Sequence, residues 1–391
     1  MPIVNRISEF QPEITAWRRE LHAHPELMYE VHRTAEFVAA KLREFGCDEV
    51  ATGIGRTGVV GRIKGRKSAQ GDGIKVVALR ADMDALPIEE ETGAPYRSTV
   101  PGRMHACGHD GHTAMLLGAA RYLTETRNFA GEAVVVFQPA EEGGAGAAAM
   151  LDDGLVEKYG IDEIYGMHNS PGMAVGTFAL RAGPAMASTD HVDIEIEGAG
   201  GHAAAPHKAI DPVLAGSQLI VALQSIVSRA ADPLEAAVIS ICQFKAGDAR
   251  NVIPQTATLI GTVRTLTPQM RDMVEKRVRE IAAGIATQSG AKIAVDYRRG
   301  YPVLVNHAGQ TDIAAQVAGE VAGQGRVSLG IPPLMAAEDF AYMLQARPGA
   351  FIFLGNGDSA GWHHPAFDFN DDAIVFGTSY WVRLVETRLP A

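Results

Sequence analysis

The stretch VVALRA, residues 76–81, is the first of four short apolar runs that decide the fold. The others are AVVVFQ at 133–138, IYGMH at 164–168 and AFIFLG at 350–355. Apolar and polar residues do not alternate in these runs, a pattern typical of strands buried on both faces of a parallel sheet. Helix-like segments at 33–46 and 113–126 alternate with them, so the sequence predicts an α/β domain whose mostly parallel sheet is covered by helices.

The middle of the chain has a different pattern. HVDIEIEG, at 191–198, alternates apolar and charged residues, as a strand does when one of its faces meets solvent. It is followed by a helix at 212–229 with proline at its start, strands at 236–247 and 256–266, a helix at about 268–288 and a strand at 292–299. The order β-α-β-β-α-β is that of a ferredoxin-like fold. We therefore predict an inserted α+β domain at 187–300, and a catalytic domain formed by 1–186 and 301–391.

The composition excludes several classes of protein. The chain has 391 residues, 47% of them hydrophobic and 21% charged, which is typical of a globular protein with more than one core. A net charge of -11 without a basic stripe argues against nucleic acid as a partner. We find no apolar run long enough for a membrane span and no secretion signal, and three scattered cysteines make no disulfide framework. These features predict a cytoplasmic protein that binds no membrane.

The side chains best suited to bind metals gather in HACGHDGH, residues 105–112. Cys107 and His109 do not share a helix face at this spacing, but Gly108 permits a backbone turn that aims both side chains at one point. Thiolate and imidazole are ligands that zinc and other borderline metals prefer. Taken alone, the motif fits a buried structural cysteine beside surface histidines equally well.

Three further segments carry candidate ligands where apolar runs end. Glu141 and Glu142 follow the run at 133–138, His168 ends the run at 164–168, and the loop after 350–355 contains two histidines, His363 and His364. Each residue alone is explained by a solvated turn or a structural histidine. All of them, however, belong to the edge of an α/β sheet where binding crevices form, and together they predict a metal site. Of the paired glutamates, one is expected to bind metal and the other to accept a proton from water.

Over nearly its full length the chain resembles the metal-dependent amidohydrolases that include aminoacylases, hippurate hydrolases and indole-acetyl-amino-acid conjugate hydrolases, within the aminoacylase and carboxypeptidase superfamily. The motifs that carry this resemblance are WRRELHAHPEL, ALRADMDALPI, MHACGHDGHTAMLLGAA, VFQPAEEGGAGA, GAGGHAAAPH, RNVIPQTATLIGTVRT, AAEDFA and HHPAF. The resemblance implies a metallopeptidase-like catalytic domain and an inserted domain that serves as lid and dimer interface. A homodimer or a higher homo-oligomer is therefore expected.

The resemblance also implies a site with two divalent metal ions per subunit. Cys107 would bridge both ions, with Glu142 and His364 completing one coordination shell and His109 and His168 the other. Thiolate and imidazole favour zinc, while manganese, cobalt and nickel stay open. The wider superfamily has a His-x-Asp pair where this chain has Asp82-Met83-Asp84, so His109 is expected to replace a ligand, and the role of Asp84 is left open.

The roles of the remaining site residues are implied in the same way. Glu141 would be the general base. His202 and Asn251, in the inserted domain, would stabilise the oxyanion and bind substrate, and Arg264 would hold a substrate carboxylate, for which guanidinium geometry is suited.

The predicted reaction is hydrolysis of the amide bond of N-acyl amino acids, such as hippurate-like conjugates, to a carboxylic acid and an amino acid. The first alternative is a metallo-carboxypeptidase or dipeptidase that acts on short peptides. A second is a cysteine hydrolase with Cys107 as nucleophile, although this leaves the ligands Glu142, His168 and His364 without a role. A third is a protein that binds metal without catalysis, but structural zinc sites use four protein ligands and leave no spare carboxylate such as Glu141.

Overall fold

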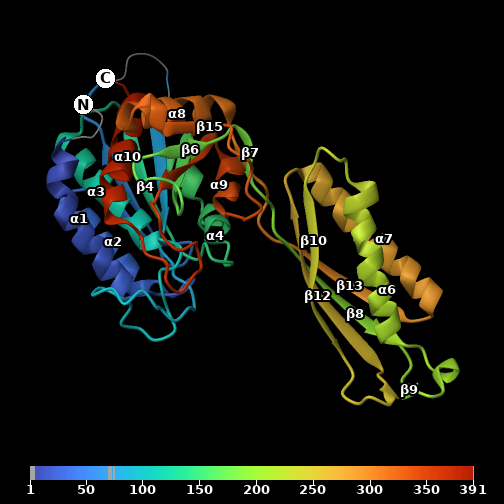
Figure 1. The fold of residues 1–391 in the computed structure, drawn as a ribbon. Helices are drawn as coiled ribbons and strands as arrows, with labels where there is room; N and C mark the ends of the chain where they lie inside the picture. The colour runs from blue at the N-terminus through green and yellow to red at the C-terminus, as the bar shows by residue number, and fades with distance from the viewer. Residues whose placement is uncertain (1–4, 69–72, 74, 391) are drawn as a thin grey trace. The chain divides into compact units, whose positions relative to one another are not determined.

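A computed structural model describes residues 5–68, 73 and 75–390 of the chain (Figure 1). The chain forms two compact units. The first consists of Met1–Gly183, Val305–Pro332 and Asp339–Ala391, and the second of Pro184–Leu304 and Pro333–Glu338. The segment Pro333–Glu338 joins the second unit although its sequence carries no signal for it.

The first unit is built on an eight-stranded sheet. Its strands are β1 (Glu49–Ile54), β2 (Gly58–Lys64), β3 (Val76–Asp82), β4 (Glu132–Gln138), β5 (Glu163–Ser170), β6 (Phe178–Leu180), β15 (Val327–Leu329) and β16 (Gly349–Gly355), in the spatial order β1-β2-β4-β3-β5-β16-β6-β15. The predicted apolar runs are the central strands β4, β3, β5 and β16, which are mutually parallel and almost wholly buried. The predicted mostly parallel sheet is thereby confirmed, and antiparallel β1 and β2 extend one edge.

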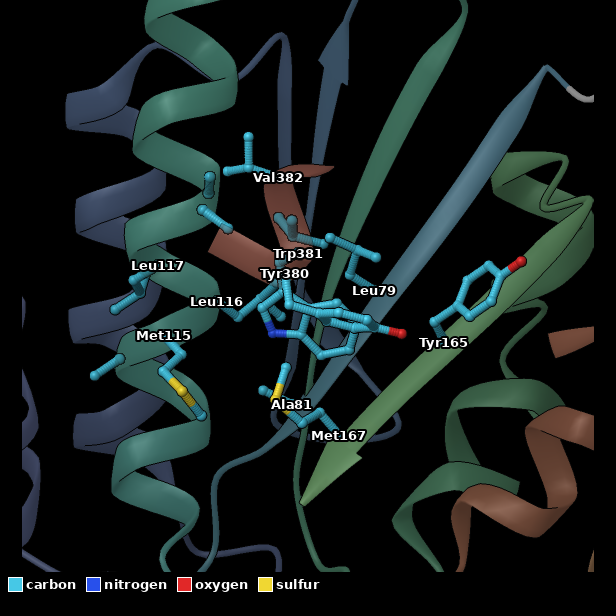
Figure 2. Packing of buried hydrophobic residues seen from close by; sticks show 14 of the residues in the cluster. Leu79, Ala81, Met115, Leu116, Leu117, Tyr165, Met167, Tyr380, Trp381 and Val382 are labelled. Carbon is cyan, nitrogen blue, oxygen red and sulfur yellow. The ribbon is translucent and has the colours of Figure 1, made fainter. Parts of the chain in front are cut away.

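Helices cover both faces of this sheet. They are α1 (Asn5–Ala23), α2 (His32–Phe45), α3 (His109–Thr126), α4 (Gly146–Asp152), α5 (Leu155–Tyr159), α8 (Ala308–Ala322), α9 (Phe340–Ala346) and α10 (Ile374–Arg388), with 3-10 turns η3 (Gln324–Arg326) and η4 (Asp371–Ala373). Helices α1, α2, α3, α8 and α10 pack together in one layer, and α4 and α9 pack against each other. Figure 2 shows side chains of α3 and α10 beside those of β3 and β5, and Leu79, Leu116 and Trp381 belong to one buried cluster.

Helix α3 begins four residues before the predicted segment at 113–126. The cause is Gly108, whose φ of 86° lets the chain turn from the preceding loop directly into the helix. A side chain at Gly108 would meet the amide of Asn169, since a Cβ placed there would lie 2.3 Å from the Asn169 Nδ2. His109 is therefore the first residue of α3, and the helix sets its direction.

The second unit has the predicted β-α-β-β-α-β order. Its main elements are β8 (Asp190–Glu197), α6 (Pro212–Ser225), β10 (Ala237–Ala246), β12 (Thr256–Thr265), α7 (Pro268–Ser289) and β13 (Lys292–Arg299). The smaller ones are β9 (Gly201–His202), η1 (Pro206–Lys208), the π-helical turn η2 (Ile226–Ala230) and β11 (Val252–Ile253). Strands β7 (Gly183–Met186) and β14 (Leu304–Asn306) pair with each other and each contain residues of both units. The antiparallel sheet has the order β10-β12-β8-β13, so the ferredoxin-like prediction is confirmed.

Capping residues set the starts of the two helices of this unit. Asp211 accepts the backbone N–H of Val213 and Thr267 accepts that of Met270, with a proline at the first helical position in each case. Both helices bury one face against the sheet, where α6 contributes Ala215, Leu219 and Leu223 to the core.

One helical segment, Pro212–Ala230, is long and apolar enough to cross a membrane when judged by its length and composition alone. It has 19 residues and a mean hydropathy of 1.3. Polar residues such as Ser217 and Gln224 interrupt its apolar residues, so the sequence shows no long unbroken apolar run here. The same segment is α6 with η2, whose inner face belongs to the core of the second unit. Its outer face exposes Leu214 and Val221, 58% and 74% accessible.

Candidate metal centre

The predicted metal ligands of the first unit lie at the edge of the sheet where β3, β4, β5 and β16 end. They are Cys107 and His109 at the start of α3, Glu142 after β4 and His168 within β5, with Glu141 beside Glu142, and with His363 and His364 in the loop after β16. Parallel strands present their carboxyl ends at one edge of a sheet, which explains why segments so distant in sequence meet.

The thiol of Cys107 is shared by two groups of possible ligands. The first is Cys107, His109 and His168, all buried, and the second is Cys107, Glu142 and His363; within each group the ligand atoms lie within 4.8 Å of one another. The Sγ of Cys107 is 3.4 Å from the Nε2 of His168. Two ligand groups that share one thiol have the arrangement that a dinuclear site with a bridging thiolate requires.

The loop after β16 brings His363, and not the predicted His364, to this cluster. The Nε2 of His363 lies 3.3 Å from Glu142 Oε1, and its backbone N–H donates to the carbonyl of Ala106 at 2.8 Å. His363 has a left-handed backbone (φ 62°), a conformation that for a residue other than glycine often marks a functional constraint. His364 is exposed, as His363 is, but its Nδ1 accepts the N–H of Ala366 and is not in a ligand group. The sequence could not separate two adjacent histidines, because only the turn at His363 decides which one faces Glu142.

Two histidines offer the same nitrogen to the centre. The Nδ1 of His109 lies 2.8 Å from the carbonyl oxygen of Asp84, and the Nδ1 of His168 lies 2.7 Å from that of Asn169. Because a carbonyl oxygen only accepts, Nδ1 carries the proton in both rings and Nε2 keeps its lone pair for a metal.

The donor set fits divalent cations. The buried atoms His109 Nε2 and Glu142 Oε1 have no hydrogen-bond partner among the described residues. Burial raises the pKa of the Cys107 thiol well above its ordinary value, and the charges of Glu142 and Glu141 raise it further. A thiolate at this position therefore needs positive charge beside it, which divalent cations supply. The hydrogen-bond contact of the Cys107 thiol among the described residues is with His168 Nε2 at 3.4 Å and not with His109, so the geometry does not favour a cysteine nucleophile activated by His109.

Asp84, whose role the sequence left open, holds the glutamates in place. One of its carboxylate oxygens accepts the backbone N–H of Glu141 and the other that of Glu142, both at 3.0 Å. Its own carbonyl accepts the proton of His109. Asp84 thus joins the ends of β3 and β4 to the start of α3 and holds the backbone of both glutamates.

Asp82 and His112 form a second support behind the ligands. Asp82 pairs with the buried guanidinium of Arg80 at 2.8 Å, and its other oxygen lies 2.7 Å from His112 Nδ1. The Nε2 of His112 accepts the backbone N–H of Asn169 at 2.9 Å. Burial raises the pKa of Asp82, but the charges of His109 and Arg80 lower it well below its ordinary value. Both nitrogens of His112 therefore have hydrogen-bond partners in this structure, although the ring also belongs to a further group of possible ligands with Asp82 and His109.

A third buried cluster ties the start of α3 to α1. Asp110 lies 2.8 Å from His22 Nδ1, and Arg18 lies 3.5 Å from Asp110 and 2.8 Å from Asp371. The other ring nitrogen of His22 lies 3.2 Å from Glu90. Burial lowers the pKa of His22, but Asp110 and Glu90 outweigh it and raise the pKa to about 9.

The predicted substrate residues His202, Asn251 and Arg264 belong to the second unit. The first two lie close together, since β9 pairs with β11 and the carbonyl of Asn251 accepts the N–H of Ala203 at 3.0 Å. Both line an open pocket of about 490 Å³. Arg264 lies half-buried on β12, and burial lowers its pKa.

Comparison with known proteins agrees with this geometry. Residues 78–387 match the family described as Peptidase family M20/M25/M40. The chain belongs to this family. It is 44% identical to the hippurate hydrolase of Campylobacter jejuni, over 98% of both chains, and 42% identical to an N-acetyl-L-cysteine deacetylase of Bacillus subtilis, over 94% of this chain and 86% of that one.

Two solved structures resemble the whole chain. A putative aminohydrolase of methicillin-resistant Staphylococcus aureus has a TM-score of 0.91 at 34% identity, with 99% of each chain covered. A dinuclear metal binding M20 peptidase of Bacillus subtilis has a TM-score of 0.84 at 36% identity, covering 98% of this chain and 99% of that one. The predicted family and metallopeptidase-like fold are confirmed: this M20 member is a metal-dependent amidohydrolase, and its candidate ligand groups support two divalent metal ions.

The sequence left open which residues support the candidate ligands. The acidic pair around Met83 was a signal for Asp84, but its two backbone partners depend on the path of the chain after β4. Asn169 had no signal except its position next to His168, and its contacts involve three separate segments.

The His22 cluster predicts a pH dependence of stability. Because the folded-state pKa of about 9 exceeds the ordinary 6.5, His22 stabilises the fold fully below pH 6.5 and loses this contribution as pH rises through 9. Between these limits its contribution to the free energy of unfolding should fall by up to about 1.4 kcal/mol per pH unit. Denaturant unfolding at several pH values should show this slope in the wild type and in His24→Gln, but not in His22→Gln. Equal slopes in all three proteins would contradict the assignment.

Proposed function

We propose that the enzyme hydrolyses N-acyl amino acids, with Glu141 as general base and two metal ions held by Cys107, His109, Glu142, His168 and His363. The observation that carries the proposal is the position of Glu141. Its side chain is buried, its ligand atom lies within 4.8 Å of those of His109 and Glu142, and it belongs to neither group that shares Cys107. A carboxylate in this position is suited to accept and deliver a proton.

The ligand assignment keeps the predicted division into two coordination shells and replaces His364 by His363. Cys107 would be shared by both ions, with His109 and His168 holding one of them and Glu142 and His363 the other. The thiolate and the three imidazoles are ligands that favour zinc. The carboxylate and the imidazoles are also suited to manganese, cobalt and nickel. Family membership and the two ligand groups support the pair of ions.

Divalent cations held by these residues would lower the pKa of a bound water to about 7. Glu141 accepts the proton of the attacking water and delivers it to the leaving amine nitrogen. Glu141 is oriented for this through its backbone N–H, which Asp84 accepts at 3.0 Å, and through its Oε1, which lies 3.4 Å from the N–H of Asp339. His202 and Asn251 carry the donors for the oxyanion, a contribution of about 3 to 4 kcal/mol per donor in comparable enzymes.

Arg264 supports a substrate with a free carboxylate. Its side chain donates to Thr262 and to the carbonyl of Val263, and no carboxylate among the described residues pairs with it. A half-buried guanidinium without an ion pair is a ready partner for the carboxylate of an amino acid. The relatives named hippurate hydrolase and N-acetyl-L-cysteine deacetylase support N-acyl amino acids as the class, and a panel that includes dipeptides would reveal the carboxypeptidase alternative.

We further propose that the enzyme is a cytoplasmic homodimer that meets its partner through the second unit. Three free cysteines, with Cys242 exposed, support a reducing compartment. Strand β10 is an edge strand, and Gly216 of the neighbouring α6 packs beside Phe244 of β10. The outer face of α6 exposes the apolar side chains of Leu214 and Val221, and a second copy of the chain would cover such a surface. An interface on this face also explains why the helix has a high mean hydropathy.

Substitution of the base tests the function. Glu141→Gln should keep both metal ions and lose nearly all kcat, because an amide cannot accept the proton, whereas Glu142→Gln should lose metal affinity. Metal analysis, together with kinetics on benzoyl, acetyl and indole-acetyl amino acids, measures both effects. If Glu141→Gln retains wild-type kcat, Glu141 is not the base; if the chelator-treated enzyme stays active on the panel, metal-dependent hydrolysis is refuted.

The two adjacent histidines offer a matched comparison. His363→Ala should weaken metal binding by about 10-fold or more, as expected when a ligand is removed, since loss of a supporting group alone costs 10 to 100-fold. His364→Ala should bind metal like the wild type, because its ring faces the N–H of Ala366. Titration with a competing chelator measures both variants. The opposite result would restore the original assignment to His364.

The dimer is tested by placing charge on the apolar face. Leu214→Asp combined with Val221→Asp should convert the dimer to a monomer in analytical ultracentrifugation, because an unpaired charge is costly to bury. Lys292→Asp, on the opposite edge strand β13, is the control and should stay dimeric. A double variant that sediments as the wild type does would exclude this face as the interface.

A further inference from the structure

Asn169 lies at a point where three ligand-bearing segments meet. It follows His168 on β5 and is wholly buried. Its side chain and backbone contact the segment of Cys107, the ring of His168, and Trp362, the residue before His363. None of these contacts is required by the strand itself, whose ladder with β16 continues through Leu354.

The first contact fixes the turn that carries Cys107. The Nδ2 of Asn169 donates to the carbonyl oxygen of Cys107 at 2.5 Å. The amide reaches this carbonyl because Gly108 has no side chain; a Cβ there would lie 2.3 Å from the same nitrogen. The contact therefore needs both residues: Asn169 donates the hydrogen bond, and Gly108 leaves room for it. Together they fix the backbone turn that carries the Cys107 thiol.

The second contact fixes the ring of His168. The His168 Nδ1–H donates to the backbone carbonyl of Asn169 at 2.7 Å, which leaves Nε2 facing the Cys107 thiol at 3.4 Å. A hydrogen bond to the second nitrogen is the usual means of fixing the tautomer and orientation of a metal-binding histidine.

The third contact reaches the loop that carries His363. The indole N–H of Trp362 lies 3.2 Å from the carbonyl oxygen of Asn169 and 3.4 Å from its Oδ1. The indole ring also meets the His168 ring edge to face, with centroids 5.2 Å apart. Since Trp362 directly precedes His363, this contact limits how far the loop can move from β5.

Asn169 is itself held from behind. Its backbone N–H donates to His112 Nε2 at 2.9 Å, and the Nδ1 of His112 is bound to Asp82 at 2.7 Å. Asp82 is anchored by the fully buried Arg80. A chain of buried, partnered groups thus runs from the sheet to Asn169, so its position does not depend on side chains exposed to solvent.

We propose that Asn169 is a positioning residue that holds the segments of Cys107, His168 and His363 in the arrangement that binds the metal pair. This inference rests on the ligand set of the proposed function. Asn169 acts through the ligands and touches neither substrate nor ion.

The test is cobalt binding, which needs no substrate. Asn169→Leu, similar in volume but without an amide, should weaken cobalt affinity by about 10 to 100-fold, the range for loss of a group that orients a ligand. At saturating cobalt its thiolate-to-cobalt charge-transfer band and d–d bands should also differ from those of the wild type. Asn306→Leu is the matched control, because Asn306 is equally buried and its side chain bonds the backbone of Arg181 and Phe351. It should lower the melting temperature yet keep wild-type affinity and spectrum.

Each result of the cobalt titrations supports or overturns the positioning role of Asn169. Wild-type affinity and spectrum in Asn169→Leu would overturn the proposal, as would equal changes in Asn306→Leu, which would reveal a general loss of stability. If Asn169→Leu does not fold, Trp362→Phe decides, since it removes the indole N–H that reaches Asn169 and keeps an aromatic ring at this position: weaker cobalt binding is expected, and an unchanged titration would overturn the proposal. A wild type that binds two cobalt ions but cleaves no N-acyl amino acid would refute the proposed function alone. A wild type without the thiolate band would refute the ligand set and this inference with it.

Discussion

The burial of acidic groups at one edge of the sheet is the constraint on which the rest of the site depends. Asp82, Asp84 and Glu141 are almost inaccessible, and Glu142 lies beside them. A carboxylate removed from water is unstable unless hydrogen bonds or positive charge compensate for the lost solvation. Arg80 and His112 compensate Asp82, and two backbone N–H groups compensate Asp84. His363 lies 3.3 Å from Glu142, and divalent cations would supply further compensation for this carboxylate and for a Cys107 thiolate.

This constraint explains why supporting residues are as numerous as ligands in the first unit. His109 and His168 each donate one ring proton to a backbone carbonyl, so their orientation is set by the chain and not by the ion. Asp84 joins three elements through its two carboxylate oxygens and its carbonyl. Such preorganised ligands do not have to be ordered when an ion binds, which spares conformational entropy and lets geometry select the metal.

The second unit is a separate fold with different surface chemistry. Its sheet is antiparallel and one of its helices, α6, keeps an apolar outer face, whereas the central strands of the first unit are buried on both sides. The half-buried Arg264 and the pocket beside His202 and Asn251 give this unit polar groups suited to a carboxylate and an oxyanion. In the proposed function the two units thus divide the chemistry, with the metal ligands and the base in one unit and the substrate contacts in the other.

The sequence by itself determined the type and order of the elements. Unbroken apolar runs identified β3, β4, β5 and β16, and alternation of apolar and charged residues identified β8. The residue pattern of a strand reports whether one or both of its faces are buried. The position of ligands at the ends of these runs was also readable, since parallel strands end at a common edge. The motifs that resemble a known family then placed Cys107, His109 and Glu142 in one site.

Only the tertiary structure decided which side chains meet. The choice between His363 and His364 depends on one left-handed residue, and the start of α3 at His109 depends on the turn at Gly108. The supporting roles of Asp84 and Asn169 arise from contacts across long sequence separations. Periodicity reports the local environment of a residue, whereas the partner of a side chain is fixed by how loops close, and that depends on the packing of the whole unit.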